Sequence, residues 1–465
     1  MTSLRRRTLL QLAGAASAAV AGCQGVDLDA GQGAAKTDQQ APNGEVTTRE
    51  AIETGLLNGI PQVRAQADDG SGTREDPYQV PADLFADYHG TVEFGSGWFE
   101  TDGVETDPDF DYSDTSTYLQ GEGVRTTTLR HAADEPSTPT VRLAGKAGNF
   151  GGVRNMTVYG AGEGDRSGDA NIVETDGNVI DYTFENVIFR WGGGDALHLA
   201  ASASGCRVQN AWVENVNGHA LYLGGGNRLK VDNVHAIGSG FLIEGAESHF
   251  TNVTIFSAGG NDGIVNTTPG NQYADVILKE GLNAGFRGTS RFSISNMHVE
   301  GAKQSAIVDG TGNSPISNVF ARNWGRADGW RPLLRASGSS VRASGVWGER
   351  TSEEYSTTLL RVEDDDCYVN GIGGTAGEPW KITIEGGTES VLDNVANVDY
   401  EHVTDEGVRT LINRWGTNDG DPAVEGEWNG HADYAGATGA TVWDTSTEPW
   451  TAYRAQPDGR NWVAL

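Results

Sequence analysis

The chain has 465 residues, 65 of them glycine, and its 64 acidic residues outnumber its 33 basic residues, which gives a formal net charge of −31 at pH 7. This balance leaves no basic surface for a phosphate backbone, so it excludes nucleic acid as a partner. The chain is long enough to bury a large core, in one domain or in several.

The basic residues are mostly arginine, and lysine is scarce. An excess of carboxylates with few lysines resembles the proteins of extreme halophiles, halophilic archaea among them, whose surfaces stay hydrated in concentrated salt. We therefore interpret the acidity as an adaptation to salt and not as a binding site.

Residues 1–23, MTSLRRRTLLQLAGAASAAVAGC, combine a twin-arginine start with a short apolar stretch and small residues before a cysteine. The pattern predicts a signal for the twin-arginine export route, with an apolar stretch too short to span a bilayer comfortably. Ala21-Gly22-Cys23 resembles the lipobox of secreted lipoproteins, so Cys23 is expected to carry a lipid anchor at the outer face of the cell membrane. The alternative is a plain signal peptide and a secreted product. Residues 24–70 have little apolar periodicity and predict a flexible tether.

Residues 71–404 contain a repeat of about 20 to 30 residues, in which an asparagine beside alternating apolar residues precedes a glycine-rich turn and a short apolar strand. Two intervals are near twice the period, and NQYADVILKEGL and SSVRASGVWGE fill them with degenerate copies. Such self-similarity predicts an all-β solenoid, because copies stacked about 4.8 Å apart bury apolar rows that one copy cannot bury alone. The asparagines that mark the copies are Asn155, Asn186, Asn210, Asn233, Asn252, Asn296, Asn318, Asn370 and Asn394.

We interpret these asparagines as an interior ladder at a sharp bend, where each amide bonds to the same residue one coil away. Asn155 and Asn252 also begin sequences of the glycosylation type, but their register favours the ladder. For Asn266, which begins a third such sequence, both interpretations stay open.

The segments GTVEFGSGWFETDG and STYLQGEGVRTTTLR resemble the opening of the pectate-lyase-like class, in which a glycine-bounded aromatic turn leads to a first coil ending in Gly-x-Gly and a Thr-Leu pair. The resemblance covers about residues 75 to 400 and implies a single-stranded, right-handed parallel β-helix with the pectin-lyase fold, of about 10 to 12 coils. The class includes polysaccharide lyases, glycoside hydrolases and viral tailspikes. It therefore implies a fold and a polysaccharide partner, but not one reaction.

Residues 405–465 leave the repeat and are rich in tryptophan. We expect them to form a C-terminal cap over the open edge of the last coil. The alternative is a small carbohydrate-binding module, because exposed aromatic faces stack on sugar rings. The tryptophans are Trp415, Trp428, Trp443, Trp450 and Trp462.

The two remaining cysteines, Cys206 and Cys367, are expected to be free and buried. About seven coils, some 30 Å or more, separate them, whereas a disulfide needs Cα atoms within about 7 Å. The acidic segment DPDFDYSD, residues 107–114, resembles the start of a calcium loop, but Tyr112 stands where that loop requires glycine. We predict no metal site, and calcium remains the single cofactor that the acidic segments would suit.

Two weaker resemblances supply candidate binding residues. WRPLLR, residues 330–335, is similar to the Arg-x-Pro-x-x-Arg motif of pectate lyases, but only Pro332 and Arg335 carry over. Arg335 is a candidate for binding an acidic sugar, or it pairs with the acidic surface. GGNDGIVN faintly resembles the Asn-x-Asp segment of β-helix polygalacturonases, which makes Asp262 a further candidate, although its row offers no second carboxylate about 5 to 10 Å away, as hydrolysis requires.

The stretches ENVIFRWGGGDALHL and QNAWVENVNGHALYL align without a gap at an offset of 24 residues. The leucines are kept, while Asp195 corresponds to His219 and His198 to Tyr222. Adjacent coils should bring Asp195 within about 5 Å of His219 and place His198 beside Tyr222. His219 held by Asp195 is the candidate base, Tyr222 the candidate acid, and His198 a candidate ligand for a substrate carboxylate. The alternative is a polar stack on a solvated face.

These observations lead to the hypothesis of an exported protein that binds an acidic polysaccharide and cleaves it by β-elimination, as a polysaccharide lyase does. The alternatives are a glycoside hydrolase on the same fold and a non-catalytic surface or adhesion protein. In each case the protein meets the membrane only through its lipid anchor.

Overall fold

The structure is a computed structural model. It describes residues 70–398 except 81–83, 85–90, 107–116, 162–167, 201, 311–312, 326–330, 339, 366, 376–377, 379 and 386–389, together with 56–57, 60–63, 403–405, 411–412, 415–418, 441–444, 446, 449, 451–455 and 462–465. The chain divides into two units, Met1–Glu45 and Val46–Leu465, and all described residues belong to the second. The predicted signal with Cys23, most of the predicted tether and the acidic segment 107–114 lie outside the described residues.

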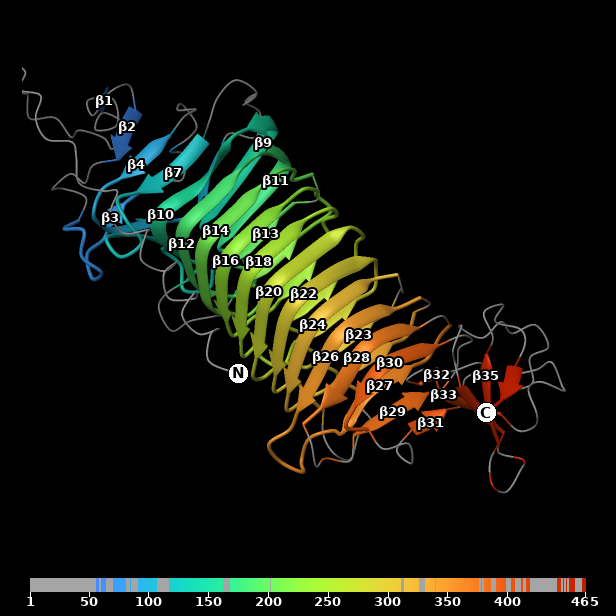
Figure 1. Ribbon diagram of the computed structural model, residues 1–465. Coiled ribbons are helices and arrows are strands. Elements are labelled where there is room, and N and C mark those ends of the chain that lie inside the picture. The colour runs from blue at the N-terminus through green and yellow to red at the C-terminus, as the bar shows by residue number, and fades with distance from the viewer. Residues whose placement is uncertain are drawn as a thin grey trace, which may run out of the picture. The chain divides into compact units, whose positions relative to one another are not determined.

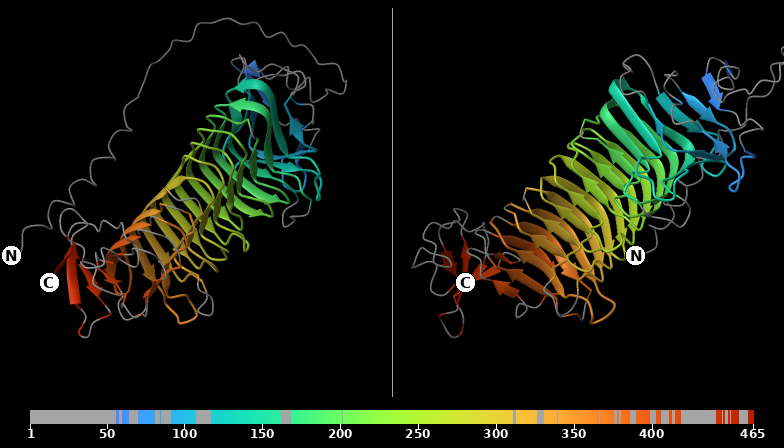
Figure 2. Two further views of the ribbon diagram at one scale, coloured as in Figure 1. Left: turned by 90° about the vertical axis from the view of Figure 1, so that its right-hand side faces the viewer. Right: turned by 180° about the vertical axis from the view of Figure 1, so that it is seen from behind.

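The described part of the second unit is an all-β parallel solenoid of about 11 coils without a helix, which confirms the predicted fold class. Each coil contributes one long strand and one short strand, and each pairs in parallel with its counterpart in the next coil (Figures 1 and 2). In the regular coils the even-numbered strands β10 to β30 form one continuous sheet, the long-strand sheet, and the odd-numbered strands β9 to β31 form the other, the short-strand sheet, of which only β9 and β11 are as long as the strands of the first.

The long strands are β10 (Gly151–Tyr159), β12 (Thr183–Gly192), β14 (Arg207–Val216), β16 (Lys230–Ile237), β18 (His249–Phe256), β20 (Asn271–Lys279), β22 (Phe292–Glu300), β24 (Pro315–Arg322), β26 (Arg342–Glu349), β28 (Tyr368–Gly374) and β30 (Val391–Ala396). The strands of the other sheet are β9 (Val141–Asn149), β11 (Val173–Ile180), β13 (Leu197–Leu199), β15 (Leu221–Leu223), β17 (Phe241–Ile243), β19 (Ile264–Asn266), β21 (Phe286–Gly288), β23 (Ile307–Asp309), β25 (Leu334–Ala336), β27 (Thr358–Val362), β29 (Lys381–Ile384) and β31 (Val403–Asp405).

Shorter strands precede and follow the regular coils. Before them lie β1 (Leu56–Leu57), β2 (Ile60–Val63), β3 (Tyr78–Gln79), β4 (Val92–Phe94), β5 (Gly97–Thr101), β6 (Val104–Glu105), β7 (Thr117–Gly121) and β8 (Thr127–His131). After them lie β32 (Leu411–Ile412), β33 (Trp415–Asn418), β34 (Thr441–Asp444), β35 (Thr451–Ala455) and β36 (Trp462–Ala464).

Each long strand is bent at one matching position, which is occupied by a residue with positive φ. In β12, Phe184, Val187 and Phe189 are fully buried, and two consecutive residues between Phe184 and Val187 point outward. Strict alternation would turn one of these two inward. Asn186, with φ of 52°, supplies the extra outward step and bends the strand, after which the inward alternation resumes.

The asparagine ladder lies on the outside of the coils, so the predicted interior position is wrong. Asn210 and Asn233 are exposed, and each donates through Nδ2 to the preceding asparagine, over 3.2 Å to Asn186 and 2.7 Å to Asn210. The left-handed conformation turns the side chain away from the core. Asn tolerates this conformation because its short amide bonds locally, and stacking lets each amide bond to the next coil.

The two degenerate copies take their predicted places. NQYADVILKEGL contains β20 and SSVRASGVWGE contains β26, and Asp275 and Gly345 occupy the bend with φ of 56° and 64°. In the following coil Gly371 takes the bend with φ of 80°, so Asn370 lies one residue before the predicted position. Asn370 still accepts a hydrogen bond of 2.6 Å from Asn394.

Asn266 belongs to the core. It is fully buried, and its Oδ1 accepts hydrogen bonds from Asn271 Nδ2 at 2.7 Å and Tyr273 OH at 2.8 Å. The amide therefore satisfies buried polar groups. In the folded protein it is not accessible for glycosylation.

Cys206 and Cys367 are free and buried, as predicted. They directly precede β14 and β28, which lie seven pairings apart along the long-strand sheet. Burial raises the pKa of Cys206 to about 11 and that of Cys367 to about 12, so both stay protonated thiols at neutral pH.

The C-terminal strands depart from the parallel pattern. β32 pairs in parallel with β30, whereas β34 pairs antiparallel with β35, and β35 with β36. The cap and the carbohydrate-binding module both remain predictions for this region. Within the described residues, no helix has the length and apolarity needed to cross a bilayer.

The buried row of the short strands can be tested at Leu221, which is fully buried in β15. Replacement by alanine should lower the free energy of unfolding by about 2 to 5 kcal/mol, because a cavity remains in a core closed by the neighbouring coils. Leu242→Ala, at a half-buried outward position one coil away, is the control and should cost clearly less. Equal losses in thermal and urea unfolding would contradict the inward assignment.

Candidate functional site

The predicted cluster forms at the start of two neighbouring short strands. Leu197 of β13 pairs with Leu221 of β15, so His198 and Tyr222 are partners in the outward row. Asp195 and His219 lie two residues before these leucines, at matching positions of adjacent coils. Residues that are 24 apart in sequence therefore become neighbours in space.

Asp195 holds two histidines. Its Oδ2 lies 2.8 Å from His198 Nδ1, and its Oδ1 lies 3.0 Å from His219 Nδ1 and accepts the backbone N–H of His219 at 2.7 Å. Both rings can donate through Nδ1, which leaves each Nε2 without a partner in the described part of the chain. His219 has 41% of its side chain exposed and Asp195 only 13%. The Asp195 carboxylate thus orients the two imidazole rings, which face solvent.

Gly218 makes this approach possible. A Cβ at this position would lie 2.6 Å from Asp195 Oδ1 and 2.6 Å from the backbone carbon of Gly194. Any side chain there would push the Asp195 carboxylate away from His219. The glycine shared by the two copies of the repeat is therefore a requirement of the site as well as of the turn.

Burial and hydrogen bonding act on Asp195 in opposite directions. Burial raises its pKa, but the hydrogen bonds from His198 and from the side chain and backbone of His219 outweigh that effect and lower the pKa well below its ordinary value. Asp195 is therefore an anion at neutral pH, suited to orient imidazole and to stabilise imidazolium.

Tyr222 links the histidines to a further carboxylate. Its ring stacks on His198, with centroids 4.3 Å apart, and its hydroxyl donates to Glu244 Oε2 at 2.5 Å. The hydrogen bond to Glu244, together with burial, raises the pKa of Tyr222 to about 12. The phenol therefore stays protonated at neutral pH and can donate a proton but not accept one.

Glu244 is a site residue that the sequence analysis missed. It follows β17, and its counterpart one coil earlier is Gly224, so the comparison of repeats gives no sign of a carboxylate there. The sequence feature that could have identified Glu244 is its position two residues beyond the outward row, in the coil next to that of Tyr222. From there a long side chain reaches back to the phenol.

A polar network continues toward the preceding coil. The backbone N–H of Asp195 donates to Asn171 Oδ1 at 2.8 Å, and Asn171 donates through Nδ2 to Glu174 at 2.8 Å. Glu174 lies 3.3 Å from Arg142 Nε. The cluster is thus flanked by carboxylates, and the nearest arginine in the network already pairs with one of them.

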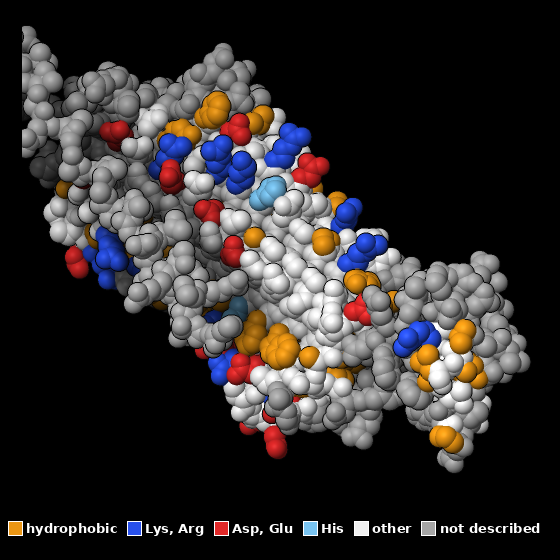
Figure 3. Space-filling model, in the orientation of Figure 1, with side chains coloured by type: hydrophobic (Ala, Val, Ile, Leu, Met, Phe, Trp, Pro, Cys, Tyr) orange, Lys and Arg blue, Asp and Glu red, His pale blue; other side chains and the backbone are white. Residues whose placement is uncertain are grey.

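Asp262 and Arg335 do not join the cluster. Asp262 is three coils from Asp195 and binds Arg287 Nε at 2.6 Å. Arg335 is five coils from Tyr222 and forms a two-pronged ion pair with Glu363, with contacts of 3.0 to 3.1 Å. Opposite charges also lie side by side along the upper margin of the solenoid in Figure 3. Arg335 thus pairs with the acidic surface, the second of its two predicted alternatives.

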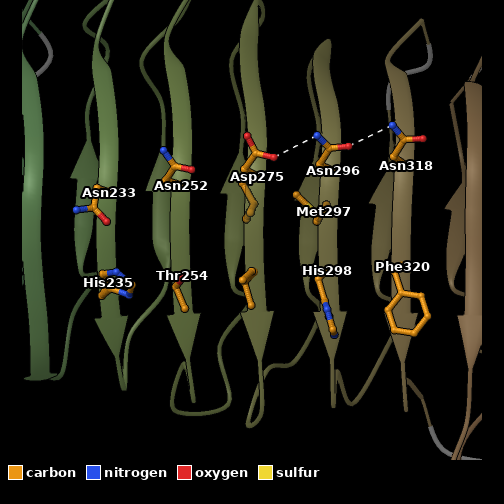
Figure 4. A pocket seen from close by; sticks show the side chains of 12 residues that line it. Asn233, His235, Asn252, Thr254, Asp275, Asn296, Met297, His298, Asn318 and Phe320 are labelled. Carbon is orange, nitrogen blue, oxygen red and sulfur yellow. Dashed lines mark hydrogen bonds between the residues drawn. The ribbon is translucent and has the colours of Figure 1, made fainter. Parts of the chain in front are cut away.

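A groove over the long strands is the second feature that sequence analysis missed. It has a cavity volume of about 590 Å³ and is lined by strands β16 to β24 (Figure 4). Its signal in the sequence was the ladder itself, because the asparagines were expected inside and their outward row was not considered as a surface. Among the described residues, no group of three or more His, Cys, Asp or Glu is arranged to hold a metal ion.

No family model matches the chain, and no curated protein matches it. Among solved structures, it is similar to the A-module of Azotobacter vinelandii mannuronan C-5 epimerase AlgE4, with 13% identity, a TM-score of 0.41 and coverage of 78% of this chain and 99% of that one. It is also similar to the catalytic domain of a GH87 alpha-1,3-glucanase in complex with nigerose, with 12% identity, a TM-score of 0.37 and coverage of 71% and 68%.

A third similarity is to DFA-IIIase from Arthrobacter chlorophenolicus A6 without its lid, with 9% identity, a TM-score of 0.43 and coverage of 70% and 88%. The neighbours of this β-solenoid thus include carbohydrate-active enzymes. At these identities no residue role is transferred to this chain, and the chemistry of the site rests on its own residues.

The low pKa of Asp195 predicts a pH dependence of stability. A carboxyl group whose pKa is lower in the folded state contributes stability that is complete above its unfolded value, about 3.9, and is lost as the pH falls through the folded value. As the pH is lowered below about 4, Asp195→Asn should therefore lose less of its thermal stability than the parent protein does. Asp176→Asn, at an exposed carboxylate, should follow the parent protein. Parallel curves for all three proteins would contradict the assignment.

Proposed function

We propose that the protein acts on an acidic polysaccharide by β-elimination at the Asp195 cluster. The observation that carries the proposal is one half-buried, ionised carboxylate holding two imidazoles through Nδ1, beside a tyrosine whose hydroxyl stays protonated. This set contains an oriented base and a proton donor on adjacent coils, which are the groups that elimination requires.

In this proposal the two histidines take different roles, one as the base and the other as the ligand of the substrate carboxylate. A neutral His219, which donates Nδ1–H to Asp195, presents the lone pair of Nε2 as the base. A protonated His198 on the other oxygen of Asp195 then presents Nε2–H to the substrate carboxylate. This pairing places positive charge where the carbanion-like charge develops.

In the reaction, His219 Nε2 takes the proton from the carbon that bears the uronate carboxylate. The electron pair of the broken C–H bond forms a double bond to the neighbouring carbon, and the bond from that carbon to the glycosidic oxygen breaks. The Tyr222 hydroxyl turns from Glu244 to the departing oxygen, protonates it, and recovers a proton from His219 through solvent. The products are an unsaturated uronate end and a new free hydroxyl, so atoms and charge balance.

Hydrolysis is the second candidate, and the contacts of the carboxylates argue against it. A glycosidase needs one carboxyl as acid and another as base or nucleophile. Both oxygens of Asp195 are engaged by histidines, and Glu244 accepts the Tyr222 hydroxyl. The non-catalytic alternative, a surface or adhesion protein, requires only binding. The test on His219 below distinguishes it from β-elimination.

The proposal includes export and anchoring through Cys23. Cys23→Ser should release the protein from the membrane fraction into the medium with its fold intact, because one lipidated residue anchors locally. Fractionation of cells that express the parent and variant chains measures this. A variant that stays in the membrane fraction would indicate an uncleaved apolar anchor and refute the lipobox.

Removing the base should abolish turnover without unfolding the protein. On a uronate polymer that the parent cleaves, His219→Ala should lower the rate of unsaturated-product formation by about two to four orders of magnitude, the usual range for lost acid–base catalysis. Its melting temperature should change little, because the side chain is 41% exposed. Ultraviolet absorbance of the product and mass spectrometry provide the readout.

His249→Ala is the matched control, since His249 is an exposed histidine on β18, outside the cluster. It should keep the parent rate. Equal activity of parent and His219→Ala, or the absence of unsaturated product from every uronate polymer, would refute elimination at this site and favour the adhesion alternative.

A further inference from the structure

The groove over the long strands consists of two parallel rows of side chains that repeat once per coil (Figure 4). The first row is the bend position and contains Asn233, Asn252, Asp275, Asn296 and Asn318. The second row lies two residues further along each strand and contains His235, Thr254, Ile277, His298 and Phe320. A ligand that follows the rows therefore lies along the stacking direction of the coils.

The bend row has unused hydrogen-bond acceptors. Asn318 donates to Asn296, and Asn296 donates to Asp275 Oδ1, both at 3.1 Å, but Asn252 donates sideways to Asp232 Oδ1 at 2.9 Å. The ladder is therefore interrupted in the middle of the groove. The side-chain oxygens of Asn233 and Asn252 and one oxygen of Asp275 receive no hydrogen bond from the described part of the chain. Such a row fits a ligand rich in hydroxyl donors.

The second row supplies flat and apolar faces. It extends beyond the groove to Trp212, 39% exposed, and Trp347, 37% exposed. Trp212 stacks on His235 with centroids 5.4 Å apart, and its Nε1 donates to Glu214 at 3.0 Å, which fixes the ring. Exposed aromatic faces bury the C–H faces of sugar rings well.

The next coil leaves room for the ring of Trp347. Its partner in the next coil is Gly373, where a Cβ would lie 2.9 Å from the indole ring. The glycine lets the ring rest against the backbone of the neighbouring coil. Six coil steps separate Trp212 from Trp347, which is roughly 29 Å at about 4.8 Å per step.

The charges beside the groove disfavour an anionic ligand. The next outward row carries Lys279 and Arg322, and both pair with Glu300, at 3.5 Å and 3.6 Å. Arg322 also lies 3.7 Å from Glu349. Within the described residues the cations of this row are thus neutralised, while Asp275 places a carboxylate in the groove itself. Among the described residues that line the groove there is one carboxylate and no lysine or arginine, so a polyanion would meet negative charge there.

We propose that this groove binds a linear, uncharged polysaccharide along the solenoid, separately from the Asp195 cluster. The hydroxyl groups of the sugar donate to the bend row, and its rings lie against the tryptophans and Phe320. The groove belongs to the long-strand sheet and the cluster to the short-strand sheet, so binding here does not depend on the proposed elimination.

Calorimetric titration of the full chain tests the proposal with cellohexaose, chitohexaose and maltohexaose as uncharged probes and hexagalacturonate as the charged probe of equal length. At least one uncharged probe should bind saturably, and hexagalacturonate should bind more weakly. Trp347→Ala and Phe320→Ala should each weaken that binding about threefold to tenfold, from the loss of one stacking contact.

Tyr368→Ala removes an exposed aromatic residue outside both rows and should leave the affinity unchanged. His219→Ala should also leave it unchanged, which separates this site from the proposed reaction. The proposal is overturned if no uncharged probe binds, if hexagalacturonate binds more tightly, or if neither groove variant changes the affinity. Concentration-dependent dimerisation that Trp347→Ala abolishes would instead assign the groove to a second copy of the chain.

Discussion

The left-handed bend residue is the constraint on which the rest of the structure depends. Each regular coil places one residue with φ between about 50° and 80° at the same point of its long strand, whether that residue is asparagine, Asp275, Gly345 or Gly371. Because a shift of one residue would turn every buried side chain outward, the bend and the apolar rows together fix the register between coils. The pairings of the regular long strands accordingly continue across the bend without a slip.

The fixed register brings residues that are far apart in the sequence into contact. It sets Asp195 beside His219 across 24 residues, with the backbone N–H of His219 donating to the carboxylate at 2.7 Å. The same register aligns the outward rows into continuous surfaces. Since the apolar rows constrain only inward positions, the outward positions can change type from coil to coil, as from His198 to Tyr222, without a cost to packing.

The features that depend on the length of the repeat could be predicted from the sequence, whereas those that depend on the direction of a side chain could not. The number of coils, the degenerate copies, the free cysteines and the proximity of Asp195 to His219 all follow from counting residues between copies. Counting does not show whether the side chain of a residue with left-handed φ faces the core or the solvent, so the asparagine ladder was predicted to lie inside. It also does not tell which carboxylate a long side chain will reach, so Glu244 and the pairing of Arg335 with Glu363 appeared only in three dimensions.

The electrostatics of the outward row on the short strands separate the candidate site from its surroundings. Farther along this row, Arg287 and Arg335 are each neutralised by a carboxylate, and Leu242 and Val265 lie between Tyr222 and Arg287. A uronate at the Asp195 cluster would therefore find no free arginine, and Glu174 and Glu244 would repel it. The positive charge must come from within the cluster, and of its groups only the imidazoles can carry one. In the proposed reaction, Asp195 would orient both imidazoles, one as the cation that binds the substrate and the other as the base.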